Sequence, residues 1–157
     1  MANKVIDLFG TRTALTITLA SLASSTVGVG RQSTLVDNTT TRHHAAVVYC
    51  KVTVGTTPTI NRSIYVYLVR YDDSAIGDDA VGATDAAQTI VNAKLLGVIA
   101  VNSASSDLSY YGVFDTSGLG ALGPKWGITI VHDTVAALNA TGSNHVIAYI
   151  GYDPEVQ

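Results

Sequence analysis

The feature that most constrains this chain is an alternation of apolar and polar residues with a period of two. Residues 15–19, for example, read Leu-Thr-Ile-Thr-Leu. Successive side chains of a β-strand point to opposite faces, so this run predicts a half-buried strand with threonines on its outer face. A surface helix would instead repeat its apolar residues every three or four positions. The alternation therefore predicts a β protein.

Six more runs share this character and are rich in the β-branched and aromatic residues that suit a pleated surface. They cover residues 47–54, 64–71, 96–101, 110–114, 126–131 and 146–150. Glycine, proline and polar residues separate them, and 157 residues suffice for one domain with a hydrophobic core. We therefore predict an all-β, single-domain β-sandwich of jelly-roll-like form over residues 13–157, preceded by an N-terminal arm or first edge strand over residues 1–12.

Two connecting segments carry local predictions of their own. Residues 55–59 read Gly-Thr-Thr-Pro-Thr, which predicts a hairpin-like turn between the strands on either side. Residues 84–92 begin with an N-cap residue type and contain helix formers, although Thr89, Ile90 and Val91 suit a strand equally well. We expect a loop or short helix there, leading into the strand near Leu95.

The beginning of the chain is apolar at Val5, Ile6, Leu8 and Phe9. An apolar arm is either a strand of the domain's own sheet or an extension that docks on a neighbouring molecule. Val5, Leu8 and Phe9 are therefore candidate protein-interface residues. Asp7 interrupts the apolar run, so it lacks the form of a signal peptide, and we expect synthesis in a cytoplasm.

The low charge of the chain bears on its partners. Only 13% of the residues are charged, about half the usual share, and the net charge is −3. Such a chain exposes mainly small and neutral polar residues, which suits close packing against neighbours, although an uncharged but solitary domain remains the alternative. The nine basic residues are scattered singly, and no apolar run reaches the length of a membrane span. We therefore expect neither a nucleic acid nor a membrane as partner.

Side chains that carry out catalysis or bind cofactors form no recognisable pattern. The acids of residues 72–79 suit a polar turn better than a calcium loop, whose spacing and closing glutamate they lack. His43 and His44 are adjacent, so on a strand they point to opposite faces, which disfavours joint metal ligation. The sequence has no nucleophile elbow, phosphate loop or dinucleotide fingerprint. We predict a protein that is not an enzyme and uses no metal or cofactor.

Tyrosines are the remaining candidates for function. Tyr65, Tyr67 and Tyr71 project from one face of a predicted strand, and we expect Tyr49 of the preceding strand beside them. A tyrosine row of this kind forms a protein interface, a sugar-stacking platform or part of a second core face. We treat Tyr65, Tyr67 and Tyr71 as candidate interface residues and leave the other two readings open.

Several segments of the chain are similar to a known group of proteins. They are residues 14–24, 30–33, 64–70, 122–128 and 137–142. Together they resemble small virion-associated proteins of tailed bacteriophages, and the resemblance covers nearly the whole chain.

This resemblance implies a structural role in the virion, most specifically that of a capsid decoration or cement protein. Such proteins bind the major capsid protein shell as dimers or trimers and stabilise it. The alternatives are a head-fibre, tail or baseplate component, or a carbohydrate-binding module for host attachment. No site residue follows from the resemblance.

Overall fold

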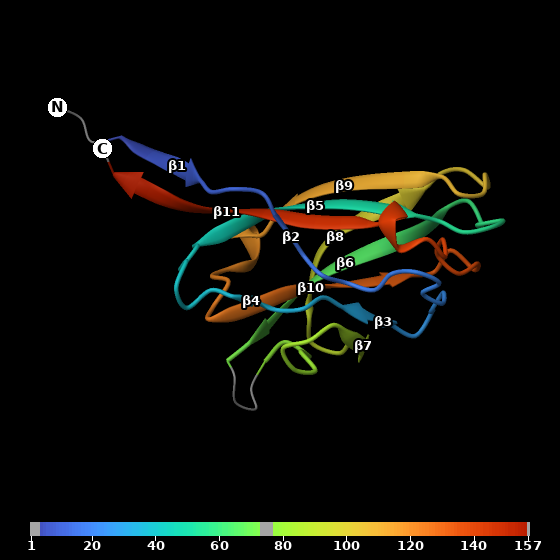
Figure 1. Cartoon of the computed structure of the whole chain (residues 1–157), viewed down its shortest axis with the longest axis horizontal. Helices are drawn as coiled ribbons and strands as arrows, with labels where there is room; N and C mark the ends of the chain where they lie inside the picture. Colours follow the sequence, from blue (N-terminus) through green and yellow to red (C-terminus); the bar gives the residue numbers. More distant parts are fainter. Residues whose placement is uncertain (1–3, 73–76, 157) are drawn as a thin grey trace.

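The computed structural model describes residues 4–72 and 77–156 (Figure 1). Its elements are β-strands and two short 3-10 turns. The strands are β1 (Val5–Phe9), β2 (Thr13–Ala14), β3 (Val29–Gln32), β4 (Val36–Asp37), β5 (Ala45–Thr53), β6 (Arg62–Tyr71), β7 (Ala86–Thr89), β8 (Lys94–Val101), β9 (Ser109–Asp115), β10 (Lys125–His132) and β11 (Val146–Val156). The 3-10 turns are Ser117–Leu119 and Gly142–Asn144.

The strands form two antiparallel sheets packed face to face. Sheet A has the order β1-β11-β5-β9, with β2 also paired to β11. Sheet B has the order β7-β3-β10-β6-β8, with β4 also paired to β10. The predicted all-β sandwich is therefore confirmed.

The connections give the sandwich a jelly-roll topology. A jelly roll has eight main strands, which here are β2, β3, β5, β6, β8, β9, β10 and β11. Numbered one to eight along the chain, they lie in the order 1-8-3-6 in sheet A and 2-7-4-5 in sheet B. The chain thus crosses between the sheets at nearly every step, as in a jelly roll. The predicted hairpin at residues 55–59 is wrong, because β5 lies in sheet A and β6 in sheet B. Turn chemistry sets the reversal but not the sheet that receives the next strand.

The expectation of a loop or short helix over residues 84–92 is wrong for the middle of this segment, although residues 84–85 and 90–92 are loop. Ala86–Thr89 form β7, which pairs with β3 at the edge of sheet B. Helix propensity is a weak preference, and here the backbone N–H and C=O groups of Ala86–Thr89 form hydrogen bonds with the free edge of β3 instead of within a helix.

The core lies between the sheets and takes alternate residues from the central strands. The largest fully buried side chain is that of Trp126 on β10, which meets the ring of Tyr149 on β11 edge-on at 4.9 Å between centroids. Cys50 on β5 is buried in the same core, and burial raises the pKa of its thiol to about 12. Its thiol is therefore neutral and unreactive at ordinary pH.

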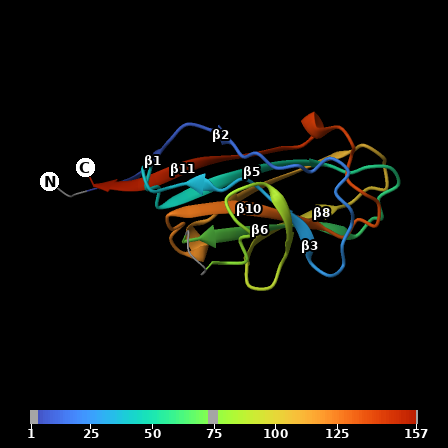
Figure 2. The same ribbon diagram turned by 60° about the horizontal axis from the view of Figure 1, so that its bottom comes forward.

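Part of the outer face of sheet B, over β3 and β10, is covered by the chain itself, whereas Val98 on the outer face of β8 stays exposed. Residues 77–93, which we call the covering segment, fold back over this face (Figure 2). The fully buried Gln32 fixes them. Its Nε2 donates to the carbonyls of Gly82 (2.9 Å) and Thr84 (3.2 Å), and its Oε1 accepts from the backbone N–H of Val81 (3.0 Å). Gln88 is also buried and accepts a hydrogen bond from the Thr129 hydroxyl.

Candidate protein-interaction surface

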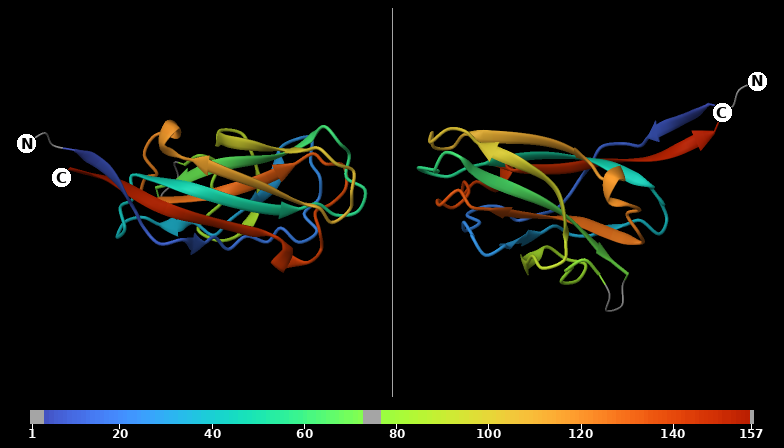
Figure 3. Two further views of the ribbon diagram at one scale, coloured as in Figure 1. Left: turned by 90° about the horizontal axis from the view of Figure 1, so that it is seen from above. Right: turned by 180° about the vertical axis from the view of Figure 1, so that it is seen from behind.

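The first and last strands form a two-stranded arm that projects beyond the rest of the sandwich (Figures 1 and 3). The arm consists of β1 and residues 152–156 of β11, in a register that pairs Val5 with Val156 and Phe9 with Tyr152. An isolated two-stranded ribbon is only marginally stable in water. The direction of this arm therefore depends on what holds its base.

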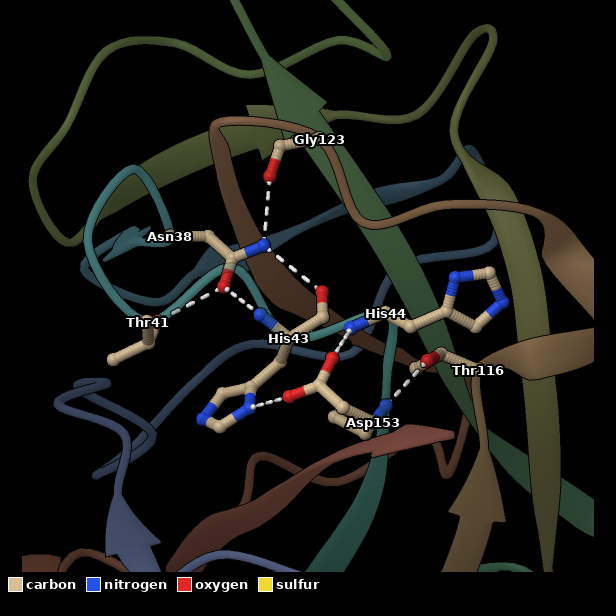
Figure 4. A network of polar contacts seen from close by, with 8 residues as sticks. Asn38, Thr41, His43, His44, Thr116, Gly123 and Asp153 are labelled. Atoms are coloured by element: carbon tan, nitrogen blue, oxygen red, sulfur yellow. Dashed lines mark hydrogen bonds and ion pairs between the residues drawn. The ribbon is translucent and has the colours of Figure 1, made fainter. Parts of the chain in front are cut away.

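Asp153 of β11 holds the base of the arm from the inner side of sheet A (Figure 4). One oxygen of its carboxylate lies 3.0 Å from Nδ1 of His43, and the other accepts the backbone N–H of His44 at 2.6 Å. Asn38 organises the loop that carries both histidines, because its side chain accepts from the His43 N–H (2.9 Å) and donates to the carbonyls of His43 (3.1 Å) and Gly123 (3.0 Å). We call the contacts of Asp153 with His43 and His44 the clasp.

The imidazole of His43 also packs against the backbone of β11. A Cβ added to Gly151 would lie 2.1 Å from Cδ2 of His43, far closer than two carbon atoms approach. The absence of a side chain at Gly151 is thus what allows the imidazole to lie against the strand.

Tyr152 holds the arm from its outer side. Its hydroxyl oxygen lies 2.8 and 3.0 Å from the two carboxylate oxygens of Asp115 on β9, to which it donates. Partial burial works to raise the pKa of Asp115, but the hydrogen bonds from the Ser117 N–H and from Tyr152 outweigh it and hold this pKa below its usual value. The ring of Tyr152 also meets that of Phe9 at 5.1 Å between centroids. The arm is therefore anchored on both sides of its base.

The outer face of the arm continues the outer face of sheet A. Ile147 and Tyr149 of β11 enter the core, so Tyr152 faces outward by alternation, and its cross-strand partner Phe9 faces the same way. Val5 and Asp7 alternate with Phe9 along β1 and share its side.

No segment of the described chain lies over the outer face of sheet A (Figure 3, left). Several of the side chains on this face are apolar and exposed. Tyr111 and Val113 of β9 are 69% and 61% exposed. A groove of about 320 Å³ runs across this face. Its lining residues are Arg12, Tyr49, Cys50, Lys51, Tyr111, Gly112, Val113 and Val146. We call the outward-facing residues Tyr49, Tyr111, Val113 and Val146 the sheet-A surface.

Positive charges border the groove, whereas a negative charge lies on the outer side of the arm. Arg12 and Lys51 border the groove, and neither makes an ion pair or side-chain hydrogen bond within residues 4–72 and 77–156. The outer side of the arm carries the exposed carboxylate of Asp7 instead. The groove is therefore cationic at its border, and the arm is anionic.

The interface residues predicted on the arm lie on both of its sides. Val5 and Phe9 face outward, whereas Leu8 pairs with Asp153 and faces the inner side; all three are largely exposed. The segment is thus a strand of the domain's own sheet, yet its side chains remain accessible.

The predicted tyrosine row is on the other sheet. Tyr65, Tyr67 and Tyr71 lie on β6 and are half-buried. Burial raises the pKa of Tyr67, and the electrostatic effect of the nearby Tyr65 raises it further. Tyr65 and Tyr67 share a hollow of about 370 Å³ with Arg62 and Asp133. The expectation that Tyr49 lies beside them is wrong, because Tyr49 belongs to sheet A and faces away from sheet B.

The sequence reading missed Tyr111 and Val113, although a signal was present. Both sides of residues 109–115 are apolar, since Tyr110 and Phe114 pack on the core while Tyr111 and Val113 face outward. An antiparallel sheet with one solvated face ordinarily has polar residues on that face. A strand that is apolar on both faces therefore indicates a second contact.

The buried histidines are engaged in hydrogen bonds. His132 contacts the Thr134 hydroxyl (2.9 Å) and the Leu22 carbonyl (3.0 Å), and burial lowers its pKa. His145 contacts the Thr53 N–H (3.3 Å) and the Asn139 carbonyl (2.9 Å). Among the residues that the structure describes, no three His, Cys, Asp or Glu side chains gather closely enough to hold a metal ion.

Comparison with known proteins gives no relative: no family model, curated protein or solved structure matches this chain. The described residues include no helix of the length and hydropathy needed to cross a bilayer.

Proposed function

We propose that this chain is a non-enzymatic structural protein that binds other protein subunits through its arm and the sheet-A surface. The observation that carries this proposal is the open apolar face of sheet A, which continues onto the outer side of the arm. A contiguous exposed apolar surface with polar groups at its border is typical of a protein interaction site. Such a surface is costly to leave in water, and a partner that covers it recovers that free energy.

Within this class, we propose a capsid decoration or cement protein of a tailed bacteriophage, located in the virion and bound to the major capsid protein. Three features support this choice: the segment resemblance to phage virion proteins, the low charge of the chain, and the jelly-roll topology, which recurs in viral capsid domains. Many copies with modest contacts stabilise a shell through multivalency. A head-fibre, tail or baseplate component is the alternative within the particle.

The test is binding to undecorated phage capsids. We expect the purified chain to co-sediment with capsids at a fixed number of copies per capsid subunit and to make the particles more resistant to heat. Val113→Glu, on the sheet-A surface, should weaken binding, whereas Val98→Glu, on the outer face of β8 in sheet B, should not. Protein that stays in the supernatant at all concentrations would contradict the capsid assignment.

A second candidate function is carbohydrate binding for host attachment. It is favoured by one observation, the hollow that Tyr65 and Tyr67 share with Arg62 and Asp133. Aromatic rings beside charged hydrogen-bonding groups suit a sugar, whose ring has apolar faces and polar edges. The double variant Tyr65→Ala, Tyr67→Ala separates the two functions. Loss of glycan binding with unchanged capsid binding would support the carbohydrate role, and unchanged glycan binding would exclude it.

A further inference from the structure

We propose that the partner on the sheet-A surface is a second copy of this chain, with the arm of each copy lying in the groove of the other. The inference rests on the proposed function in one respect, the assignment of this surface to protein binding. It goes further by naming the occupant and the residues that meet.

The arm and the groove lie on the same side of one continuous sheet. Tyr152 and its partner Phe9 on β1 face the same outward side as Val146, which lines the groove at the other end of β11. The two features are therefore displaced along the strands and do not face each other within one molecule. A single copy cannot place its own arm in its own groove.

A two-fold axis solves this problem for both copies at once. If the outer faces of two sheets A meet around an axis that crosses the strands between arm and groove, each arm reaches the other copy's groove. The contact is then isologous and closed, so it makes a dimer and not a filament. Face-to-face packing of two sheets with their strands roughly aligned is a common arrangement.

The chemistry of the two surfaces is complementary. Val5 and Phe9 on the arm are 63% and 58% exposed and would pack against Tyr111 and Val113. The carboxylate of Asp7 lies between these two apolar side chains on the outer side of β1 and would meet Arg12 and Lys51 of the other copy. Opposite charges at the border of an apolar contact fix its register and suppress wrong partners.

The arm is also prepared for binding. The clasp on its inner side and the Tyr152–Asp115 contact on its outer side fix its direction before a partner arrives. Less conformational entropy is then lost on association. The clasp contacts only the inner side of the arm, so Val5 and Phe9 on the outer side stay exposed.

The experiment is sedimentation of the purified full chain over a range of micromolar concentrations, without capsids. We expect a monomer–dimer equilibrium. Val113→Glu should weaken dimerisation by at least about a hundredfold, because it buries an unpaired charge, whereas Val98→Glu should leave it unchanged. Circular dichroism and thermal melting of both variants are the check that each is folded.

Charge reversal tests the arm-in-groove geometry itself. Asp7→Lys and Lys51→Glu should each weaken the dimer by about tenfold, and the double variant should dimerise more tightly than either single one. The matched control is Glu155→Lys, since Glu155 pairs with Ile6 on the inner side of the arm and should not affect dimerisation.

A wild-type chain that remains monomeric, or that forms trimers or open chains, would overturn the inference. A dimer in which the effects of Asp7→Lys and Lys51→Glu on the dissociation constant simply add in the double variant would overturn it as well. These results are distinct from failure of the proposed function, which is read from capsid binding. A dimer that ignores capsids retains the inference, and a monomer that coats capsids through the sheet-A surface retains the function.

Discussion

The outer faces of both sheets carry tyrosines and valines, but the chain covers them to different extents. On sheet B, the covering segment lies over β3 and β10, and the buried amides of Gln32 and Gln88 satisfy its backbone. On sheet A, nothing in the described chain covers Tyr111 and Val113. The part of sheet B over β3 and β10 is thus covered within the molecule, whereas Tyr111 and Val113 of sheet A can be covered only by another molecule. Apolar residues on both sides of a strand indicate a second layer without saying which chain supplies it.

The largest effect should come from breaking the cover of sheet B. Gln32→Ala removes the partner of two carbonyls and one N–H in the covering segment, and unsatisfied buried backbone groups are costly. We expect the free energy of unfolding to fall by about 2–3 kcal/mol in urea titrations. Tyr111→Ala on the open face is the control, with little expected change. Equal losses for the two variants would contradict the difference between the faces.

A smaller effect is expected at the base of the arm. Asp153→Ala removes the acceptor of the His44 N–H and the partner of His43, which should cost about 1–2 kcal/mol. Hydrogen exchange should show faster exchange over residues 5–9 and 152–156 and little change in the core strands. Glu155→Ala, also on the inner side of the arm, is the control. Unchanged exchange in the arm would show that the clasp does not hold it.

Acid should loosen the cover of sheet B before the core unfolds. Partial burial works to raise the pKa values of Asp79 and Asp85, but both lie below the usual value. Hydrogen bonds from the backbone N–H groups of residues 91–93 lower the pKa of Asp79, and Arg31 lowers that of Asp85. A lowered pKa in the folded state gives stability that is complete above the unfolded pKa of about 4 and is lost as pH falls through the folded pKa. Exchange over residues 79–93 should therefore accelerate below about pH 4, before exchange in the core strands. Asp79→Asn should make this step less dependent on pH.

The smallest effect on stability should be that of Val113→Glu. Measured at a dilution where the chain is monomeric, its free energy of unfolding should stay within about 0.5 kcal/mol of the wild-type value, because Val113 faces solvent in the monomer. A loss well above this value would mean that the open face of sheet A is used within the molecule.

The period-two pattern was enough to predict the fold class, but the strand predicted at residues 15–19 is wrong. Strand pairing ends with β2 at Ala14, and residues 15–19 keep the alternation of buried leucines and exposed threonines without forming a strand. The pattern could not predict β7, because Ala86 and Ala87 favour a helix locally and only the free edge of β3 makes them a strand. Nor could it show that Tyr49 and Tyr65 lie on opposite outer faces, because residues 55–59 do not encode the sheet to which β6 belongs.

The candidate surface was only partly predictable for a related reason. The apolar arm at Val5, Leu8 and Phe9 is visible in the sequence, because it precedes the regular strands. The sheet-A surface depends on which outer face the covering segment occupies. That choice is made by Gln32 and Gln88, whose amides are far from Tyr111 and Val113 in the sequence.

Pairing of Val5 with Val156 places the beginning and end of the chain on neighbouring strands of the arm. A short linker between them would therefore turn the arm into a covalently closed hairpin, and new ends opened in the loop between β8 and β9 would give a circular permutant of the same fold. In such a molecule β1 cannot detach from β11 and exchange with another copy, so the permutant would distinguish a docked arm from a swapped one.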